Sequence, residues 1–191
     1  MRKLSYYIAL TIDGFIAAPD GTYDFYPLSE EFVGFLAGEF ADTLPTAARR
    51  VLGVDEVPNR RYDTVVMGRG TYDPALKEGI TSPYAHLRQI VFSRSLDASP
   101  DPAVEIVSDD PVAFVRELKR EEGLDIYLCG GADLAGQLID EIDELVIKSY
   151  PVVAGAGIPL FRAEFGPRAF LPTGSRSFEN GTVVTTYTRK R

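Results

Sequence analysis

Short hydrophobic runs alternate with amphipathic stretches along most of this 191-residue chain. Runs rich in β-branched and aromatic residues predict strands, whereas apolar residues three or four positions apart predict helices. Several runs are continuously apolar, which is typical of central strands covered on both faces of a sheet. The predicted strands are residues 4–11, 64–67, 89–92, 104–107, 126–128 and 145–150. Their alternation with helices indicates an α/β fold with a mostly parallel sheet.

Four helices are predicted between these strands from their end signals and apolar stripes. The first follows Ser29, a favourable cap, and carries acidic residues in its first turn. The second opens at Asp110-Pro111 and ends before Gly123. The third covers residues 133–142, and a fourth begins near Arg69. These segments supply the helices of the expected α/β layers.

The last part of the chain follows a different pattern. Residues 175–179 and 182–188 are rich in strand-forming residues and flank Asn180-Gly181. An Asn-Gly pair tolerates the positive φ angles of a type I′ turn, so these residues predict an antiparallel hairpin. The expected sheet is therefore mostly parallel and ends in an antiparallel pair of strands.

One domain is expected for residues 1–191, because no repeat, low-complexity tract or linker divides the chain. The polar stretch 42–61, which contains two prolines, predicts an inserted helix and loop. Hydrophobic residues make up 45% of the chain and charged residues 25%, which is ordinary for a folded domain. The only cysteine, Cys129, excludes an intramolecular disulfide and fits a reducing compartment such as the cytoplasm.

The charge and hydropathy of the chain exclude two classes of partner. A net charge of -8 argues against non-specific nucleic-acid binding, which depends on a basic surface. No apolar run approaches the length of a membrane span. Any anionic ligand must therefore meet a few locally placed arginines and backbone N–H groups.

Three strand ends combine glycine, arginine and hydroxyl groups in a way that suits phosphate. Gly68 follows the second predicted strand, and Arg69 and Thr71 open the helix behind it. Ser93 and Arg94 follow the third strand and suit a ribose 2′-phosphate. Taken separately, each of these turns is also compatible with an ordinary connection.

At the last of these three strand ends, the apolar strand 126–128 continues through Cys129 into Gly130-Gly131 and a helix. Two glycines allow a pyrophosphate to approach the backbone closely. The stretch lacks the G-x-G-x-x-G spacing of the common dinucleotide fingerprint. Cys129 itself is interpreted mainly as a packing residue.

Metal and hydrolase chemistry find no support in the sequence. The chain has one histidine, His86, and one cysteine, which cannot form a transition-metal site. No G-x-S-x-G motif or nucleophile triad is present. His86 is expected to lie in a surface loop.

In this order along nearly the whole chain, the motifs resemble the dihydrofolate-reductase-like family. The similarity is greater to the subfamily of the bacterial riboflavin-biosynthesis reductase domain. It is carried by residues 9–17, 67–72, 92–94, 129–131 and 155–161. The resemblance implies a three-layer α/β fold, NADPH as cofactor and a homodimer.

The resemblance also implies which positions bind the cofactor. Those matching the phosphate, 2′-phosphate and pyrophosphate–nicotinamide contacts are Gly68, Arg69, Thr71, Ser93, Arg94, Cys129, Gly130, Gly131, Ala132, Asp133 and Leu134. Ala9 and Ile16 are further cofactor-binding positions. Residues 16–25 correspond to a loop that closes over the nicotinamide. The resemblance further implies a cis peptide bond between Gly130 and Gly131.

Departures from the family bear on the substrate. The chain has no tryptophan, so Phe25 is expected to replace the loop tryptophan of folate reductases. Carboxylates that could hold substrate or supply a proton are Asp13, Glu30, Glu31 and Asp24. Asp13 ranks first because it ends a strand and matches an acidic position of the subfamily. Three of them also have a structural alternative: turn formation by Asp13 and compensation of the helix dipole by Glu30 and Glu31.

The leading functional hypothesis is a reductase that transfers hydride from NADPH to a pyrimidine- or pterin-linked substrate. The specific prediction is reduction of 5-amino-6-(5-phosphoribosylamino)uracil, in which the ribose opens to a ribityl chain. Folate or pterin reduction is the alternative within the same class. A catalytically silent nucleotide-binding protein is the alternative from another class.

Overall fold

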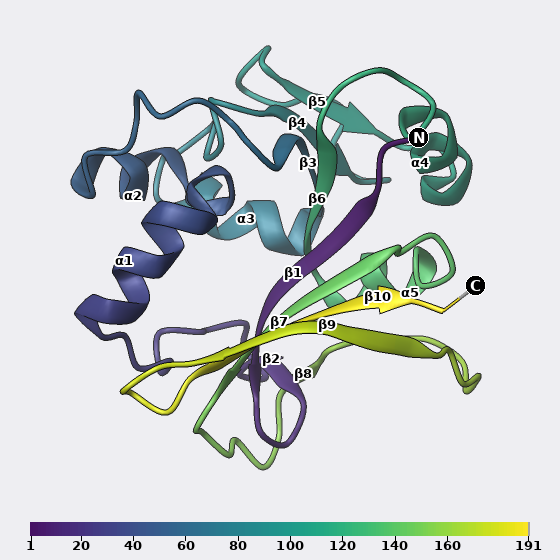
Figure 1. Cartoon of the computed structure of the whole chain (residues 1–191). Helices are drawn as coiled ribbons and strands as arrows, with labels where there is room; N and C mark the ends of the chain where they lie inside the picture. The colour runs from purple at the N-terminus through teal and green to yellow at the C-terminus, as the bar shows by residue number, and fades with distance from the viewer. Residues whose placement is uncertain (191) are drawn as a thin grey trace.

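An eight-stranded sheet lies at the centre of the computed structural model, which describes residues 1–190 (Figure 1). Its strands, in spatial order, are β5 (Val104–Val107), β4 (Arg88–Phe92), β3 (Tyr62–Gly68), β6 (Asp125–Gly130), β1 (Leu4–Thr11), β7 (Glu144–Tyr150), β10 (Val183–Arg189) and β9 (Phe170–Ser177). The first six strands pair in parallel, β10 pairs antiparallel with β7, and β9 pairs antiparallel with β10. The predicted α/β fold and its antiparallel C-terminal hairpin are confirmed.

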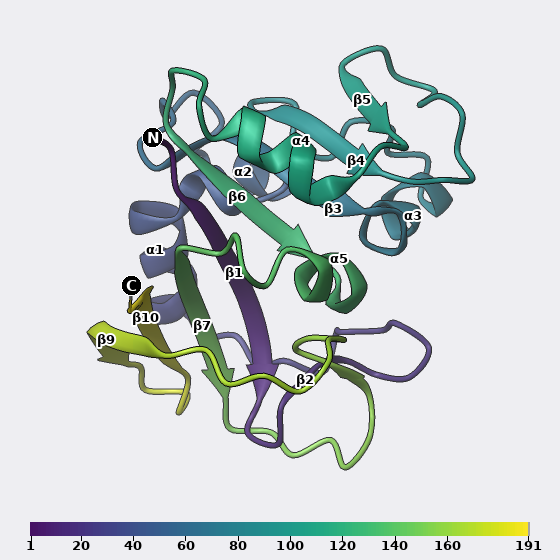
Figure 2. The same ribbon diagram turned by 90° about the vertical axis from the view of Figure 1, so that its right-hand side faces the viewer.

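Helices cover both faces of this sheet (Figure 2). They are α1 (Glu30–Glu39) and α3 (Arg69–Lys77) on one face, and α4 (Pro111–Leu118) and α5 (Ala132–Gln137) on the other. Because side chains alternate along a strand, β3 contributes to both cores. Val65 packs in one buried cluster with Phe32, whereas Val66 packs in the other with Val115 and Leu134. The result is the predicted three-layer arrangement.

Several element boundaries differ from the sequence-based prediction. A two-stranded sheet of β2 (Phe15–Ala17) and β8 (Ile158–Pro159) was not predicted, because neither strand is long enough to show alternation. Helix α5 ends at Gln137 rather than continuing to residue 142. Its backbone leaves the helix at Leu138, which is fully buried and keeps the apolar pattern going past the helix end.

The turn of the C-terminal hairpin is not of type I′. Asn180 does not have a positive φ, whereas Gly181 has a φ of 81°. The Gly181 N–H donates to Phe178 O at 2.9 Å, and the Phe178 N–H donates to Thr182 O at 2.9 Å. The loop therefore has three residues, in which a type I turn is followed by a left-handed glycine. The Asn180 side chain stabilises the end of this loop, because its oxygen accepts from the Thr182 N–H at 3.0 Å.

The inserted stretch contains a short 3-10 helix, η1 (Ala41–Thr43), and helix α2 (Thr46–Val51), as the expected helix and loop. Two buried charged residues hold it. The Asp42 carboxylate accepts from three backbone N–H groups at residues 60–62, at 2.7–3.1 Å. The Arg49 guanidinium donates to the carbonyls of Ala41 and Val57 at 2.8 and 2.6 Å. These charge-assisted bonds fix the insertion against the start of β3.

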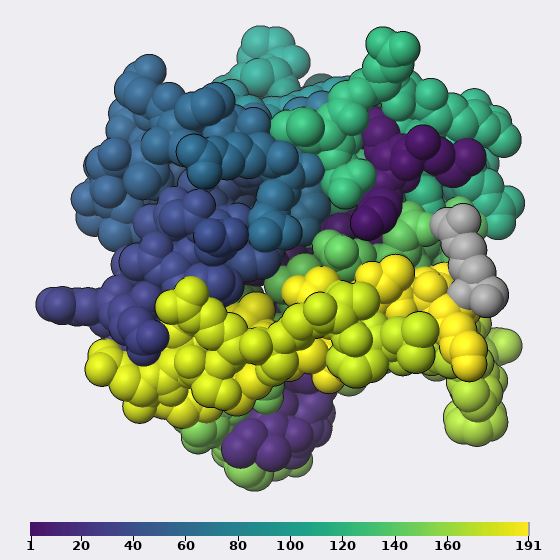
Figure 3. All heavy atoms as spheres, viewed as in Figure 1, coloured from purple at the N-terminus to yellow at the C-terminus, as the bar shows by residue number. Residues whose placement is uncertain are grey.

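The C-terminal hairpin runs across the surface seen in Figure 3, next to α1. Most of β9 is exposed, and β9 is the last strand of the sheet. The Glu31 carboxylate joins α1 to the hairpin, because it accepts from Glu179 N–H at 3.0 Å and lies 3.8 Å from the Arg176 guanidinium. No helix within residues 1–190 is long and apolar enough to span a membrane.

Candidate active site

A cavity of about 630 Å³ opens where the parallel strands end. The ends of β3, β4 and β6 and the later residues of β1 and β7 border it, together with the segment after β2 and the inserted stretch. In open α/β sheets, ligands commonly bind outside the carboxyl ends of the strands. The cavity has two chemically distinct parts, one rich in glycine and arginine and one rich in tyrosine.

The first and third glycine motifs meet on one side of the cavity. Met67 and Gly130 are register partners in the neighbouring strands β3 and β6. A Cβ placed on Gly131 would lie 3.5 Å from Thr71 Oγ1, and one placed on Gly68 would lie 3.6 Å from Leu134 Cβ. The Gly130–Gly131 peptide bond is cis, as expected. Residues 60 positions apart in sequence thus form one continuous surface.

Arg69 brings the second motif to the same surface. Its guanidinium donates to Ser95 Oγ at 2.7 Å and lies 3.3 Å from the Asp73 carboxylate. Ser93 Oγ is turned inward and accepts from the backbone N–H groups of Ser95 and Leu96. Arg94 is exposed, and within residues 1–190 it has no hydrogen-bond or ion-pair partner. One guanidinium is therefore anchored and the other is free to meet an anion.

Two helices begin at this surface without a side-chain cap. Gly68 precedes α3 and Gly131 precedes α5, and neither can offer an oxygen to the first N–H groups of its helix. Such groups carry partial positive charge and satisfy anions. A Cβ on Gly70 would meet nothing within 4 Å, so the first turn of α3 is open. This part of the cavity therefore provides donors for phosphate oxygens.

The other part of the cavity is lined mainly by aromatic rings. They are Tyr7, Tyr23, Tyr26, Tyr84 and Tyr127, joined by Thr43, Leu44 and Pro45 from the insertion. The Tyr127 hydroxyl donates to Cys129 Sγ at 3.2 Å, and the Tyr84 hydroxyl lies 3.5 Å from the same sulfur. Burial raises the pKa of Tyr84, Tyr127 and Cys129, so all three stay neutral at physiological pH.

Lys148 on β7 is the cation of this aromatic part. Its ammonium nitrogen lies 4.0 Å from the centre of the Tyr7 ring. Within residues 1–190 it forms no hydrogen bond or ion pair. Burial lowers its pKa from 10.5 to about 8, and the nearby Cys129 opposes this shift. In the β1–β7 register Lys148 stands beside Ala9, at the border between the two parts of the cavity.

The carboxylates that the sequence favoured lie outside the lining of this cavity. Asp13 accepts from Thr11 Oγ1 at 2.7 Å and from the backbone N–H groups of Ala154 and Gly155 at 3.0 and 2.6 Å. These bonds, the one to Thr11 most strongly, lower the pKa of Asp13 to about 2. Asp13 is thus ionised at neutral pH and cannot donate a proton there, whereas a role in holding substrate stays a prediction. Glu30 and Asp24 are exposed.

Most of the expected cofactor positions do border the cavity. They are Ala9, Ile16, Gly68, Arg69, Thr71, Cys129, Gly131, Ala132, Asp133 and Leu134. Ser93, Arg94 and Gly130 are not among the lining residues. In the loop after β2, Tyr23 rather than Phe25 borders the cavity. The sequence analysis missed Lys148 and the tyrosines, because isolated strand and loop residues carry no motif.

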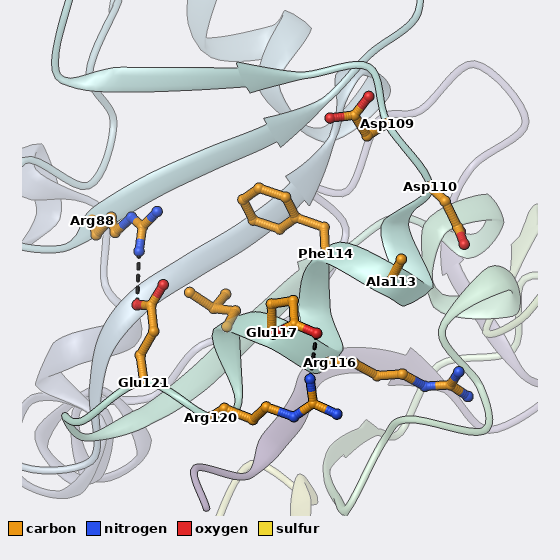
Figure 4. Close-up of a pocket in the computed structure, with 10 residues that line it drawn as sticks. Arg88, Asp109, Asp110, Ala113, Phe114, Arg116, Glu117, Arg120 and Glu121 are labelled. Carbon is orange, nitrogen blue, oxygen red and sulfur yellow. Dashed lines mark hydrogen bonds and ion pairs between the residues drawn. The ribbon is translucent and has the colours of Figure 1, made fainter.

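A second cavity, of about 460 Å³, lies along α4 and is shown in Figure 4. Four of its charged groups pair with one another, Arg88 with Glu121 at 2.9 Å and Arg120 with Glu117. Arg116 pairs with Glu141 at 2.7 Å. Because most of these charges are paired and the strand-end motifs line the other cavity, we assign the functional site to the cavity at the strand ends. Residues 1–190 contain no cluster of three or more metal-binding side chains.

Fold and site together define a protein of the dihydrofolate-reductase-like class. The sequence model described as "RibD C-terminal domain" matches residues 2–184, and the chain belongs to this family. Two proteins of Bacillus subtilis (strain 168), both uncharacterized, are similar in sequence. YwjB is 35% identical over 162 residues, which cover 84% of this chain and 83% of YwjB. YyaP is 26% identical over 200 residues, covering 97% and 94%.

Solved structures support the same class. A protein from Shewanella sp. PV-4, assigned provisionally to riboflavin biosynthesis, has a TM-score of 0.73 and 26% identity, and 99% of each chain is covered. A deaminase/5-amino-6-(5-phosphoribosylamino)uracil reductase from Thermotoga maritima has a TM-score of 0.64 and 16% identity, covering 99% of this chain and 57% of that one. Dihydrofolate reductase from Enterococcus faecalis, complexed with NADP(H), has a TM-score of 0.64 and 15% identity, covering 99% and 97%. The last two show a shared fold.

Proposed function

We propose that residues 1–191 act as one NADPH-dependent reductase domain, with 5-amino-6-(5-phosphoribosylamino)uracil as the first substrate to test. The observation that carries the proposal is the meeting of the first and third strand-end motifs on one side of the cavity, with the second motif joined to them by the hydrogen bond from Arg69 to Ser95. When bound there, NADPH supplies hydride to an electron-poor carbon of the substrate. The name of the Thermotoga maritima neighbour, which includes this uracil reductase activity, supports the choice of substrate.

The donor groups on this side fit a phosphorylated dinucleotide. The uncapped starts of α3 and α5 can bind pyrophosphate oxygens, with Arg69 beside the first of them. Arg94 has no partner within residues 1–190 and can meet a 2′-phosphate. Ala9 and Ile16 offer apolar contacts toward the tyrosine-lined part, where we propose that the nicotinamide ring lies.

Folate or pterin reduction is less well supported by the tyrosine-lined part of the cavity. A carboxylate facing the substrate is what a folate reductase would need there. Glu31 is instead used by the C-terminal hairpin, and Glu30 is exposed and outside the lining. The lining carboxylate, Asp133, pairs with Arg162 at 3.0 Å on the other side.

The decisive experiment measures cofactor binding and turnover separately. We expect the protein to bind NADPH more tightly than NADH in a calorimetric titration, and to oxidise NADPH when 5-amino-6-(5-phosphoribosylamino)uracil is added. Dihydrofolate serves as the comparison substrate. Binding of NADPH without turnover of either compound would favour the catalytically silent alternative. Absence of saturable NADPH binding would refute the proposal. The homodimer and the cytoplasmic location also stay predictions.

A further inference from the structure

The tyrosine-lined part of the cavity contains one cation among the described residues, Lys148. Lys148 borders the cavity beside Ala9 and has no hydrogen-bond or ion-pair partner within residues 1–190. A half-buried ammonium that faces only a ring and a thiol is costly to keep in a fold. Lys148 neither forms an ion pair with its neighbours nor caps a helix, so its position in the cavity indicates that it binds a ligand.

We propose that Lys148 is the proton donor of this site, binding the acceptor oxygen or nitrogen of a flat ring substrate and protonating it. The inference rests on the proposed reductase function, because it assumes that hydride arrives at the neighbouring carbon. The substrate class is a planar ring compound that stacks among the tyrosines and presents a carbonyl or imine to the ammonium.

The step balances with a reduced nicotinamide as hydride source. Hydride adds to the acceptor carbon, the π bond to oxygen or nitrogen breaks, and its electron pair moves to that atom. An N–H bond of the Lys148 ammonium then breaks as its proton passes to the same atom. The lysine is left as a neutral amine and regains a proton from water. The net consumption is one NADPH and one proton for each substrate reduced.

The groups that face Lys148 cannot take over this role. Tyr7 lies under the ammonium from β1, and Cys129 faces it from β6. Tyr84 and Tyr127 approach the same thiol, and Tyr150 lies two residues further along β7. Burial raises the pKa of every one of these hydroxyl and thiol groups. Val184 of β10, the register partner on the other side, carries no titratable group.

Lys148 is the group of this cluster that exchanges protons close to neutral pH. Its pKa, which burial lowers to about 8, leaves the ammonium charged at pH 7 but ready to release a proton. No carboxylate borders this part of the cavity within residues 1–190. An acceptor that develops negative charge is therefore favoured over the amidine face of a pterin, which needs a carboxylate.

The test uses phenanthrenequinone and phenanthrene, which share one flat shape but differ in their carbonyls. Binding of each is measured by calorimetry to the NADP⁺-saturated protein, in the wild type and in Lys148→Met, Lys148→Arg and Lys3→Met. Lys3 is exposed outside the cavity and serves as the control. We expect the quinone to bind about 10-fold more tightly than the hydrocarbon, and Lys148→Met to abolish this difference. Equal binding of the two probes by the wild type, or binding of neither, overturns the proposal.

Proton donation is tested by the rate of NADPH oxidation with phenanthrenequinone as a function of pH. We expect the wild-type rate to fall as the pH rises through about 8. In Lys148→Met the rate should be about 100-fold lower and independent of pH in this range. Lys148→Arg should still bind the quinone more tightly than the hydrocarbon, but its rate of NADPH oxidation should fall. A quinone that binds as expected but is not reduced, or is reduced equally by Lys148→Met, overturns the donor role.

Two readouts separate this proposal from the reductase assignment. Lys148→Met should bind NADPH as tightly as the wild type does. A wild type that does not bind NADPH counts against the reductase function itself. The pKa of Lys148 is measured without any ligand by NMR of ¹³C-labelled lysine. One resonance should titrate near pH 8 and be missing from Lys148→Met. If all lysines titrate near 10.5, Lys148 is not the donor.

Discussion

At the scale of single residues, Arg94 is the position where cofactor choice can be tested. Its guanidinium is exposed and without a partner within residues 1–190, whereas Arg69 is already bonded to Ser95 and Asp73. We expect Arg94→Ala to weaken NADPH binding about 10- to 150-fold and to leave NADH binding nearly unchanged, since one charged hydrogen bond is worth about 1.5–3 kcal/mol.

The measurement is a pair of calorimetric titrations, one with each cofactor. Arg120→Ala is a suitable control, because Arg120 is also exposed but pairs with Glu117 on α4 away from the site. Equal losses of affinity for NADPH and NADH would show that Arg94 does not contact the 2′-phosphate.

Asp13, the carboxylate predicted to hold substrate, also has a structural role. Its bonds to Thr11, Ala154 and Gly155 join the turn after β1 to residues 154–155. Its pKa is lowered from 3.8 to about 2, so the stability it contributes is present above pH 3.8 and is lost as the pH falls toward 2. Asp13→Asn should therefore lower the Tm at neutral pH, and this difference should vanish in acid.

Kinetics of Asp13→Asn test the predicted contact with substrate. If Asp13 contacts substrate, Asp13→Asn should raise the KM for the substrate and leave the NADPH affinity unchanged, in addition to any change in Tm. If KM and kcat are both unaltered while the Tm falls, Asp13 acts only in the turn. Thermal scans between pH 2 and 7 with steady-state assays at neutral pH provide both results.

At the scale of elements, α5 is held so closely that one of its glycines cannot be replaced. A Cβ on Gly136 would lie 1.8 Å from the carbonyl oxygen of Arg162, whose N–H donates to Ala132 O at 3.0 Å. Because the contact is with backbone, Gly136→Ala must shift the segment before β9. We expect it to lower the free energy of unfolding by about 1–3 kcal/mol, or more if the segment cannot move.

Gly34 provides the matched comparison, since it is also inside a helix but a Cβ there meets nothing within 4 Å. Gly34→Ala should raise the free energy of unfolding by about 0.5–1 kcal/mol. Urea denaturation of both variants measures the two effects. A neutral or stabilising Gly136→Ala would mean that α5 and residue 162 are not packed as described.

The same pair of glycines shows where sequence reasoning ends. Both occupy helical stretches and look alike in sequence, and only the fold brings Arg162 to one of them. The long strands and the caps at Ser29 and Asp110 were predictable, because each depends on neighbours in the chain. The turn at Asn180-Gly181 was assigned the wrong type, because the loop length depends on where the two strands pair.

At the scale of the whole molecule, the cavity combines parts that the sequence predicts to different degrees. The phosphate-binding side follows from strand ends with glycine and arginine, so its residues could be found from motifs. The tyrosine-lined side is assembled from β1, β6, β7, the loop after β2, the insertion and the segment before β4. Each contributes one to three residues without a pattern of its own. Contacts of this kind are set by sheet order, such as Ala9 beside Lys148, and could not be predicted.

The outer edge of the sheet bears on how the molecule assembles. β9 ends the sheet, is exposed along nearly its whole length and carries Leu171, which is 52% exposed. An open edge strand of this length can pair with another chain. We expect a homodimer in which β9 contributes to the contact, so sedimentation at micromolar concentration should give about twice the 21.0 kDa mass of one chain.

Leu171→Lys should shift the population toward monomer, whereas Val51→Lys, at an exposed position on α2, should not. A wild-type protein that sediments only as a monomer would contradict the dimer, and a dimer unaffected by Leu171→Lys would place the contact away from β9.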